Sequence, residues 1–173
     1  MSRSASAKTG LLALALVGGC SASQRGAEMA RPQPVFDVGA FFAGRTMGDG
    51  RVKVMFSGAE RLRVDGQGRT EADGTLVLDQ QVHRGDRPVV KRQWRMRSAG
   101  DGRITGTLSD ASGPVSGDVH GNVLHLRYPL KGGTDADQWI YLQDGGKLAV
   151  NRMNISKFGM TVATVDEAIR KLD

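Results

Sequence analysis

Apolar and polar residues alternate along much of the chain with a period of two. Five segments carry apolar side chains on one face and polar or charged side chains on the other: 51–56, 61–65, 75–79, 90–97 and 103–108. This period is typical of β-strands that bury one face. Turn-forming pairs such as Asp73-Gly74 separate the segments. The pattern therefore predicts short antiparallel strands joined by hairpins.

One hairpin can be predicted in register. Gly121-Asn122 fits a two-residue type II′ turn, with glycine at the first central position. This turn pairs apolar residues on one face, namely Val119 with Leu124, Gly117 with Leu126 and Val115 with Tyr128. On the other face it places Asp118 opposite His125. Because the apolar faces coincide, the register supports the hairpin.

Two short helices are expected at the ends of the folded part. Residues 36–42 form the first, with Asp37 as the N-cap and Gly44 as the stop signal. Thr164 to Glu167 match a capping box, and Ile169 and Leu172 follow on one helical face. The second helix is therefore predicted at the C-terminus, packed against the sheet or covering one end of it.

An all-β fold accounts for these elements. About 8–10 short strands in meander order predict an antiparallel up-and-down β-barrel, and a β-sandwich is the alternative. The chain of 173 residues has room for one domain, and 24 glycines with 5% aromatic residues fit the corners and bulges of a barrel. A single cysteine excludes an internal disulfide framework and a cysteine-based zinc cage.

The first twenty residues have the pattern of a secretory signal. Arg3 and Lys8 precede an apolar run over residues 11–17, which is too short for a transmembrane helix. The sequence Val17-Gly18-Gly19-Cys20 then resembles a bacterial lipobox, which makes Cys20 the lipidation site. The alternative is a short core helix followed by a buried cysteine.

These features divide the chain into three parts. Residues 1–19 are the signal peptide, residues 20–34 the lipidated N-terminus and flexible tether, and residues 35–173 a single β-barrel domain. The expected membrane partner is reached through the lipid anchor. Ser21 after the cysteine resembles a signal for the outer membrane, so we expect the protein on its periplasmic face in a Gram-negative envelope.

Several short motifs then occur in a recognisable order. They are residues 41–44, 92–94, Gly106, 110–117, 121–122, Tyr128, 138–142, 151–153 and 157–159. With this spacing the chain resembles the bacterial lipoprotein family known as domain of unknown function 3833. The resemblance runs from about Phe41 to the C-terminus and implies a lipocalin-like, calycin-type barrel. Members often have an acidic residue in the fourth-strand region, where this chain has Gln80 in the run 78–83.

Arg92 is the main candidate for ligand binding. It lies on the same strand face as Val90, Trp94 and Met96. If that face points inward, the guanidinium needs a carboxylate or an anionic ligand, because an unpaired buried charge is costly. Trp94, Tyr128 and Trp139 are further candidates for lining such a site. The alternative is a structural arginine stacked on Trp94 at the barrel end.

Other polar clusters give weaker signals. Asp118, His120 and His125 share one hairpin face and could hold a metal or act as a base, but that face is more typical of solvent-exposed surface. Nucleophile elbows, phosphate loops and dinucleotide fingerprints are missing from the sequence. We therefore assign no catalytic residue, metal or cofactor, and an enzyme is not the expected class.

Positive charge is concentrated in one strand region. Residues 84–97 contain six basic residues and one acidic residue, in a chain with a formal net charge of +6. For a protein of the envelope this pattern favours contact with phospholipid or lipopolysaccharide headgroups and not with nucleic acid. The alternative is an ordinary solvated strand face.

Three functional hypotheses follow. The first is a lipid-anchored protein whose barrel binds a small amphiphile such as a fatty acid. The second is a structural or assembly lipoprotein with a filled barrel, which acts through its surface. The third, and least favoured, is an enzyme that acts on lipids.

Overall fold

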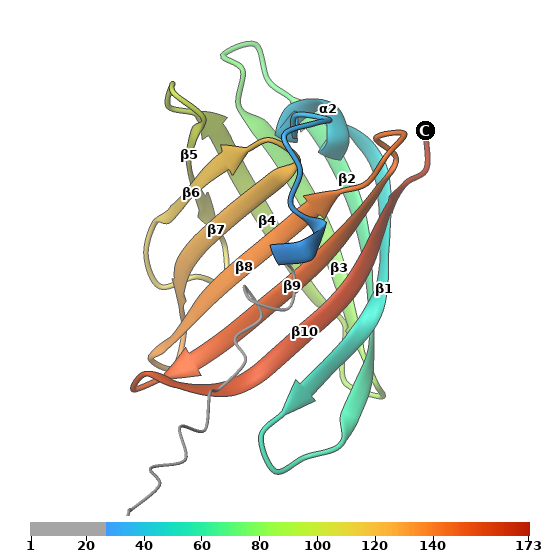
Figure 1. Ribbon diagram of the computed structural model, residues 1–173. Coiled ribbons are helices and arrows are strands. Elements are labelled where there is room, and N and C mark those ends of the chain that lie inside the picture. The colour runs from blue at the N-terminus through green and yellow to red at the C-terminus, as the bar shows by residue number, and fades with distance from the viewer. Residues whose placement is uncertain (1–26) are drawn as a thin grey trace, which may run out of the picture.

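The chain folds into a closed antiparallel β-barrel of ten strands (Figure 1). The computed structural model describes residues 27–173. Each strand pairs with its neighbours in the chain, and β1 pairs with β10 to close the barrel. The strands are β1 (Gly44–Val54), β2 (Ala59–Thr70), β3 (Leu76–Arg84), β4 (Val90–Ser98), β5 (Arg103–Leu108), β6 (Val115–His120), β7 (Val123–Leu130), β8 (Thr134–Leu142), β9 (Leu148–Lys157) and β10 (Met160–Lys171). The predicted up-and-down barrel is confirmed, and the sandwich alternative is wrong because the sheet has no open edges.

Side chains alternate between the interior and the outer wall along each strand. The predicted apolar positions form the interior core, with Leu78, Trp94 and Leu126 among its buried residues. The predicted hairpin is confirmed in register, since Val119 pairs with Leu124 and Asp118 with His125. Gly121 has a φ of +55°, as the first central position of its turn requires.

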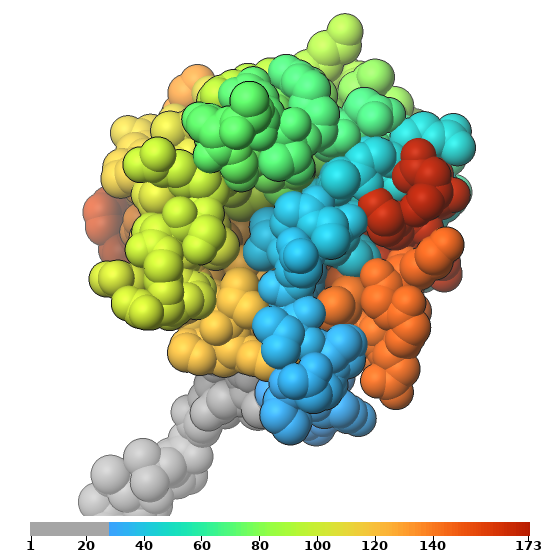
Figure 2. Space-filling model, turned by 90° about the horizontal axis from the view of Figure 1, so that it is seen from above, coloured from blue at the N-terminus to red at the C-terminus, as the bar shows by residue number. Residues whose placement is uncertain are grey.

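A short helix covers one end of the barrel, called here the upper end. Helix α2 (Val38–Phe42) begins after Asp37, whose Oδ1 accepts a hydrogen bond of 2.9 Å from the Ala40 N–H, so the predicted N-cap is confirmed. Phe36, Phe41 and Phe42 pack against one another inside this end, Phe41 edge-on to the other two, and all three are buried. The view from above shows this segment crossing the upper end (Figure 2).

The segment before α2 follows the outer wall. It contains the 3-10 helix η1 (Ala27–Met29) and is held by the buried Asn122. The Asn122 side chain accepts from the Arg31 N–H at 2.6 Å and donates to the carbonyls of Met29 and Leu142. The turn that fixes the β6–β7 hairpin therefore also attaches the N-terminal segment.

The predicted C-terminal helix is wrong, because residues 160–171 form strand β10. Val165, Glu167 and Ile169 all point inward, which is a period of two. Glu167 interrupts the alternation of apolar residues in this segment. For this reason the sequence resembles a capping box followed by a helical face, which led to the wrong prediction. Pairing with both β1 and β9 satisfies the backbone of this segment and decides its conformation.

The predicted signal peptide, the lipobox and residues 20–26 of the tether lie outside the described residues. Residues 27–173 contain no helix with the length and apolar character needed to span a membrane.

Candidate functional site

Arg92 points into the barrel at mid-height. Its Nε donates a 2.8 Å hydrogen bond to Oε1 of Gln80 on the adjacent strand β3. The same oxygen accepts a 2.9 Å bond from Trp94 Nε1, and the guanidinium lies 5.7 Å from the Trp94 ring centre. Gln80 therefore fixes both the arginine and the tryptophan. Arg92 has no carboxylate partner within 4.0 Å among residues 27–173.

A second row of polar groups crosses the interior opposite this cluster. Tyr128 Oη donates to Gln138 Oε1 at 2.8 Å, and Gln138 Nε2 donates to Asn151 Oδ1 at 3.2 Å. Asn151 Nδ2 then donates to Glu167 Oε2 at 2.8 Å. All four side chains are buried, and they come from β7, β8, β9 and β10. Tyr128 packs edge-on against Trp94 with ring centres 5.2 Å apart, which joins the row to the Arg92 cluster.

Glu167 is the buried acid of this interior. Burial raises the pKa of its carboxyl above the ordinary value, while the Asn151 hydrogen bond and the positive charge of Arg92 oppose this rise. Burial likewise raises the pKa of the Tyr128 hydroxyl, again opposed by Arg92. Glycine at position 48 on the facing strand leaves the space that the carboxyl occupies, since a methyl group there would overlap it.

The lower half of the interior is apolar. Val52, Leu62, Val64 and Val165 form a second buried cluster, separate from the main core. Val54, Val82 and Met153 pack against this cluster and are only partly buried. The polar cluster around Arg92 therefore has an apolar wall between it and the lower end.

The inward side chains of β3, β4 and β9 become more exposed toward the lower end, whereas Val52, Leu62 and Val165 of β1, β2 and β10 stay buried. Along β4, Met96 and Trp94 are each 4% exposed, Arg92 is partly buried and Val90 is 50% exposed. The inward rows of β3 and β9 show the same change, from buried Leu78 and Ala149 to half-buried Val82 and Ile155. Helix α2 fills the upper end, and neither helix of the described residues covers the lower one (Figure 1). Along β4, Arg92 therefore lies between the buried upper interior and the exposed Val90.

The structure brings together three of the four candidate ligand-binding residues. Arg92, Trp94 and Tyr128 share the interior, whereas Trp139 lies on the outer wall, since its neighbours Gln138 and Ile140 point inward. Trp139 stacks on His125 with ring centres 3.6 Å apart. The prediction that Trp139 lines the interior is therefore wrong.

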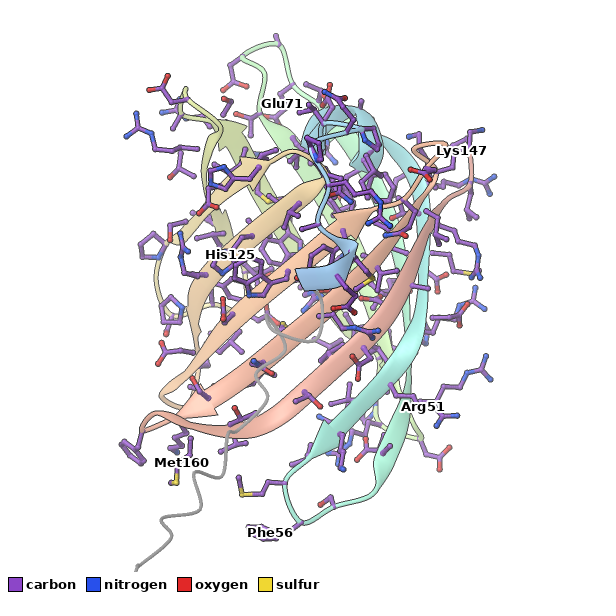
Figure 3. All side chains as sticks on the ribbon, viewed as in Figure 1. Arg51, Phe56, Glu71, His125, Lys147 and Met160 are labelled. Atoms are coloured by element: carbon purple, nitrogen blue, oxygen red, sulfur yellow. The ribbon has the colours of Figure 1, made fainter. Side chains whose placement is uncertain are left out.

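The acidic and histidine residues of the β6–β7 hairpin also lie on the outer wall, near His125 (Figure 3). Arg127 donates to His125 Nδ1 at 2.9 Å and to Asp118 Oδ1 at 2.8 Å. Because Nδ1 accepts, Nε2 carries the ring proton and donates to Asp137 Oδ1 at 2.5 Å. Within residues 27–173 the structure has no metal-binding group of three such residues. These contacts form an ion-pair network on the surface and leave no open site for a metal.

The basic segment 84–97 is divided between different surroundings. Arg84 and Arg87 both pair with Glu60, and Arg95 pairs with Glu71. Hydrogen bonding from Arg87 lowers the pKa of Glu60, and hydrogen bonding from Arg95 lowers that of Glu71. Since Arg92 points inward, only Lys91 and Arg97 of the six basic residues lack a salt bridge on the described surface. The segment is therefore not a continuous cationic face.

Two of the hollows in the barrel lie near these residues. A groove of about 700 Å³ crosses β1–β4 and is lined by outward residues such as Asp65 and Lys91, and also by Gln80 and Arg92. A hollow of about 450 Å³ lies beside α2 and is bordered by Phe36, Met96 and other core residues. The groove therefore reaches the Arg92 cluster, and none of the four buried residues of the lower apolar cluster lines it.

Sequence reasoning missed Gln80, Gln138 and Glu167 as parts of the interior and left open whether Asn151 lines a pocket. Each is polar and occupies an inward position of its strand. The strand period, extended through these positions, is the one signal in the sequence that places them inside.

The family model described as "Protein of unknown function (DUF3833)" matches residues 14–171. No curated protein matches the chain. An S-type phycobiliprotein lyase from Guillardia theta superposes with a TM-score of 0.60 at 9% identity, over 80% of this chain and 94% of that one. A DUF3598 protein of unknown function from Nostoc punctiforme gives 0.59 at 10% identity, over 81% of this chain and 50% of that one. At these identities the two structures show a shared barrel fold.

Proposed function

The chain belongs to the DUF3833 family and folds as a lipocalin-like barrel, and from this premise we propose that it binds a small amphiphile with an anionic head group inside that barrel. The head group is a carboxylate or phosphate held by Arg92. The apolar tail lies against the lower cluster of valines and leucine and points to the lower end.

The observation that carries the proposal is the state of Arg92. Its Nε is fixed by Gln80, while the terminal N–H groups have no hydrogen-bond partner among residues 27–173. A guanidinium held in this way offers two parallel donors, which match a carboxylate or phosphate. Glu167 forms no ion pair with Arg92 within the described residues, and its carboxyl is held by Asn151. An incoming anion would supply the missing counter-ion.

The second candidate function is a structural envelope protein that acts through its surface. The filled upper half of the barrel favours it, because Phe36, Phe41 and Phe42 occupy the space under α2. It requires no ligand at Arg92, so the same experiment separates the two. A lipid-modifying enzyme remains the least favoured class.

Quenching of Trp94 by a brominated fatty acid tests the proposal. In a Trp139→Phe background, Trp94 is the sole tryptophan and lies beside Arg92. We expect saturable quenching, and Arg92→Ala should weaken binding by about tenfold to a hundredfold, the range for a charge-assisted hydrogen bond. Native mass spectrometry followed by lipid extraction should identify an amphiphile that copurifies with the protein.

The matched control is Arg97→Ala. It removes the same residue type from the same strand but from the outer face, so the affinity should stay unchanged. The methyl ester of the fatty acid should bind as weakly to the wild type as the acid binds to Arg92→Ala. Saturable binding that is unaffected by Arg92→Ala and by the methyl ester would contradict the assignment to Arg92. Absence of quenching would favour the structural role.

We also propose that the protein is anchored in the cell envelope through lipidated Cys20. The support is the apolar run and lipobox-like residues at 11–20, together with membership of the family. Labelling with a radioactive fatty acid in a bacterial host should mark the wild type and not Cys20→Ser. Fractionation should place the wild type in the outer membrane, and recovery of both proteins in the same soluble fraction would refute the anchor.

A further inference from the structure

Large apolar side chains are exposed mainly at the lower end of the barrel. They lie on the tips of three hairpins and are called here the lower rim: Met55, Phe56, Val89, Val90, Phe158 and Met160. Phe56 is 100% exposed and Phe158 is 88% exposed. Figure 3 shows Phe56 and Met160 at this end, directed away from the barrel. The tips of β1–β2 and β9–β10 are neighbours, since the Met55 N–H donates to the Val162 carbonyl at 2.8 Å.

The backbone at two of these tips is unusual. Phe56 and Phe158 have φ values of 61° and 51°, in the left-handed region that bulky residues rarely adopt. Glycine or asparagine would fit such turns without strain. A backbone conformation that costs free energy and places an aromatic ring in water is a reason to look for a function there.

Charge around the rim has one sign at these two tips. Residues 53–59 and 157–162 contain Lys53 and Lys157 and no acidic residue. The Lys157 ammonium lies 5.7 Å from the Phe158 ring centre. Neither lysine forms an ion pair within the described part of the chain. Each tip therefore carries an apolar ring and a lysine, and at the β9–β10 tip the lysine lies over the ring.

The upper end is different in composition. Its turns over residues 71–75, 99–102 and 143–147 contain glycine and acidic residues. Asp101, the third residue with a left-handed φ apart from glycine, is polar and occupies the tip of the β4–β5 turn. The apolar and basic character therefore belongs to one end, the end that neither helix of the described residues covers.

We infer that the lower rim docks onto a phospholipid bilayer containing anionic lipids, with Phe56 and Phe158 inserted among the acyl chains. Rings on separate protruding tips suit a deformable surface, and Lys53 and Lys157 lie where headgroup phosphates would be. This docking places the open end of the barrel against the membrane. The inference rests on the proposed function only for the nature of the ligand. It adds the surface from which the amphiphile is taken or to which it is delivered.

A fluorescent label at the tips tests this inference. The full chain with Cys20→Ser has no cysteine, so one label can be placed through Phe56→Cys, Phe158→Cys or Asp101→Cys. The probe is an environment-sensitive dye, and the vesicles contain phosphatidylethanolamine with phosphatidylglycerol, or phosphatidylcholine alone. We expect emission from positions 56 and 158 to rise several-fold on the anionic vesicles and to be quenched by brominated lipids. The label at 101, on an equally strained turn at the upper end, should not respond.

Two further variants make the result specific. With the label at Met160→Cys, Phe56→Ser combined with Phe158→Ser should weaken vesicle binding by about tenfold or more, the effect of removing two inserted rings. Lys53→Glu with Lys157→Glu should abolish the preference for anionic vesicles.

Two outcomes would overturn the docking surface. The first is that flotation shows the protein bound to vesicles while the emission of the tip labels stays at the value measured without vesicles. The second is a response that appears without vesicles and grows with protein concentration, since a second copy of the chain would then cover the rim. Arg92→Ala should insert like the wild type, so loss of fatty-acid binding and loss of docking are distinguishable.

Discussion

Glu167 is a buried acid whose inward position a hydrophobic pattern does not predict. It lies in the inward row of β10 and is held by Asn151, in a space that glycine at position 48 leaves open. Its pKa is raised by burial, so the folded protein binds its proton more tightly than the unfolded chain does. The contribution of this residue to stability therefore falls as the pH rises from the ordinary value near 4.5 through the raised value.

We predict that Glu167→Gln removes this loss of stability. The free energy of unfolding of the variant, measured by urea denaturation between about pH 4 and pH 8, should depend less on pH and exceed the wild-type value at the upper end of that range. Glutamine keeps an oxygen that accepts from Asn151. Arg92→Ala should enlarge the wild-type loss and extend it to higher pH, because the positive charge that lowers the pKa of folded-state Glu167 is gone.

Glu71→Gln is the control at this scale. Its carboxyl is exposed, and hydrogen bonding from Arg95 lowers its pKa, so the sign is opposite. Any stability that it contributes is present above its ordinary pKa and is lost as the pH falls through the lowered value. A Glu167→Gln curve parallel to that of the wild type would contradict a buried carboxyl with a raised pKa.

At the scale of elements, the N-terminal segment depends on one side chain. Asn122 has hydrogen bonds to Arg31, Met29 and Leu142 and is 2% exposed. Substitution by alanine leaves three backbone groups, two in the N-terminal segment and one at the end of β8, without this partner. The segment also carries Phe36, whose N–H donates to the Gly121 carbonyl at 2.8 Å. The lid at the upper end should therefore loosen together with the segment.

We predict that Asn122→Ala lowers the free energy of unfolding by about 1–3 kcal/mol, the cost of unpaired buried groups. It should also make the chain near Arg31 more sensitive to trypsin. Asn154→Ala is the matched control, because Asn154 is also buried but has no side-chain hydrogen bond among the described residues. Equal losses in the two variants would show that volume alone matters at these positions.

At the scale of the whole molecule, the barrel depends on the contact between its first and last strands. Gly50 in β1 pairs with Glu167 in β10, and a methyl group at Gly50 would overlap the Asp166 carbonyl oxygen. The two strands can approach because no side chain separates them. This close contact joins residues that are far apart in the chain and completes the pairing of every strand.

We predict that Gly50→Ala destabilises the barrel by about 1–3 kcal/mol, the usual cost of overpacking, with a lower midpoint in thermal unfolding. Gly58→Ala is the control, since Gly58 lies in the β1–β2 turn with no atom within 4 Å of the added methyl and no left-handed φ. It should be neutral or slightly stabilising. An unchanged midpoint in Gly50→Ala would mean that β1 and β10 can move apart at this position without loss of stability.

The sequence by itself determined the class of the fold and much of its register. Strand periodicity, turn pairs and the Asp37 cap are local properties, and they predicted the meander, the β6–β7 hairpin and the first helix. It also placed Arg92 and Trp94 on one strand face, because alternation is fixed within a strand.

Tertiary structure decided what depends on contacts between distant segments. Closure by β10 replaced the local helix signal at residues 164–172, because pairing on both sides outweighs a capping pattern. Which face is inward followed from closure alone, and it placed Trp139 outside and Gln80, Asn151 and Glu167 inside. Polar residues at inward positions are invisible to a hydrophobic pattern, since they are stabilised there by partners from other strands.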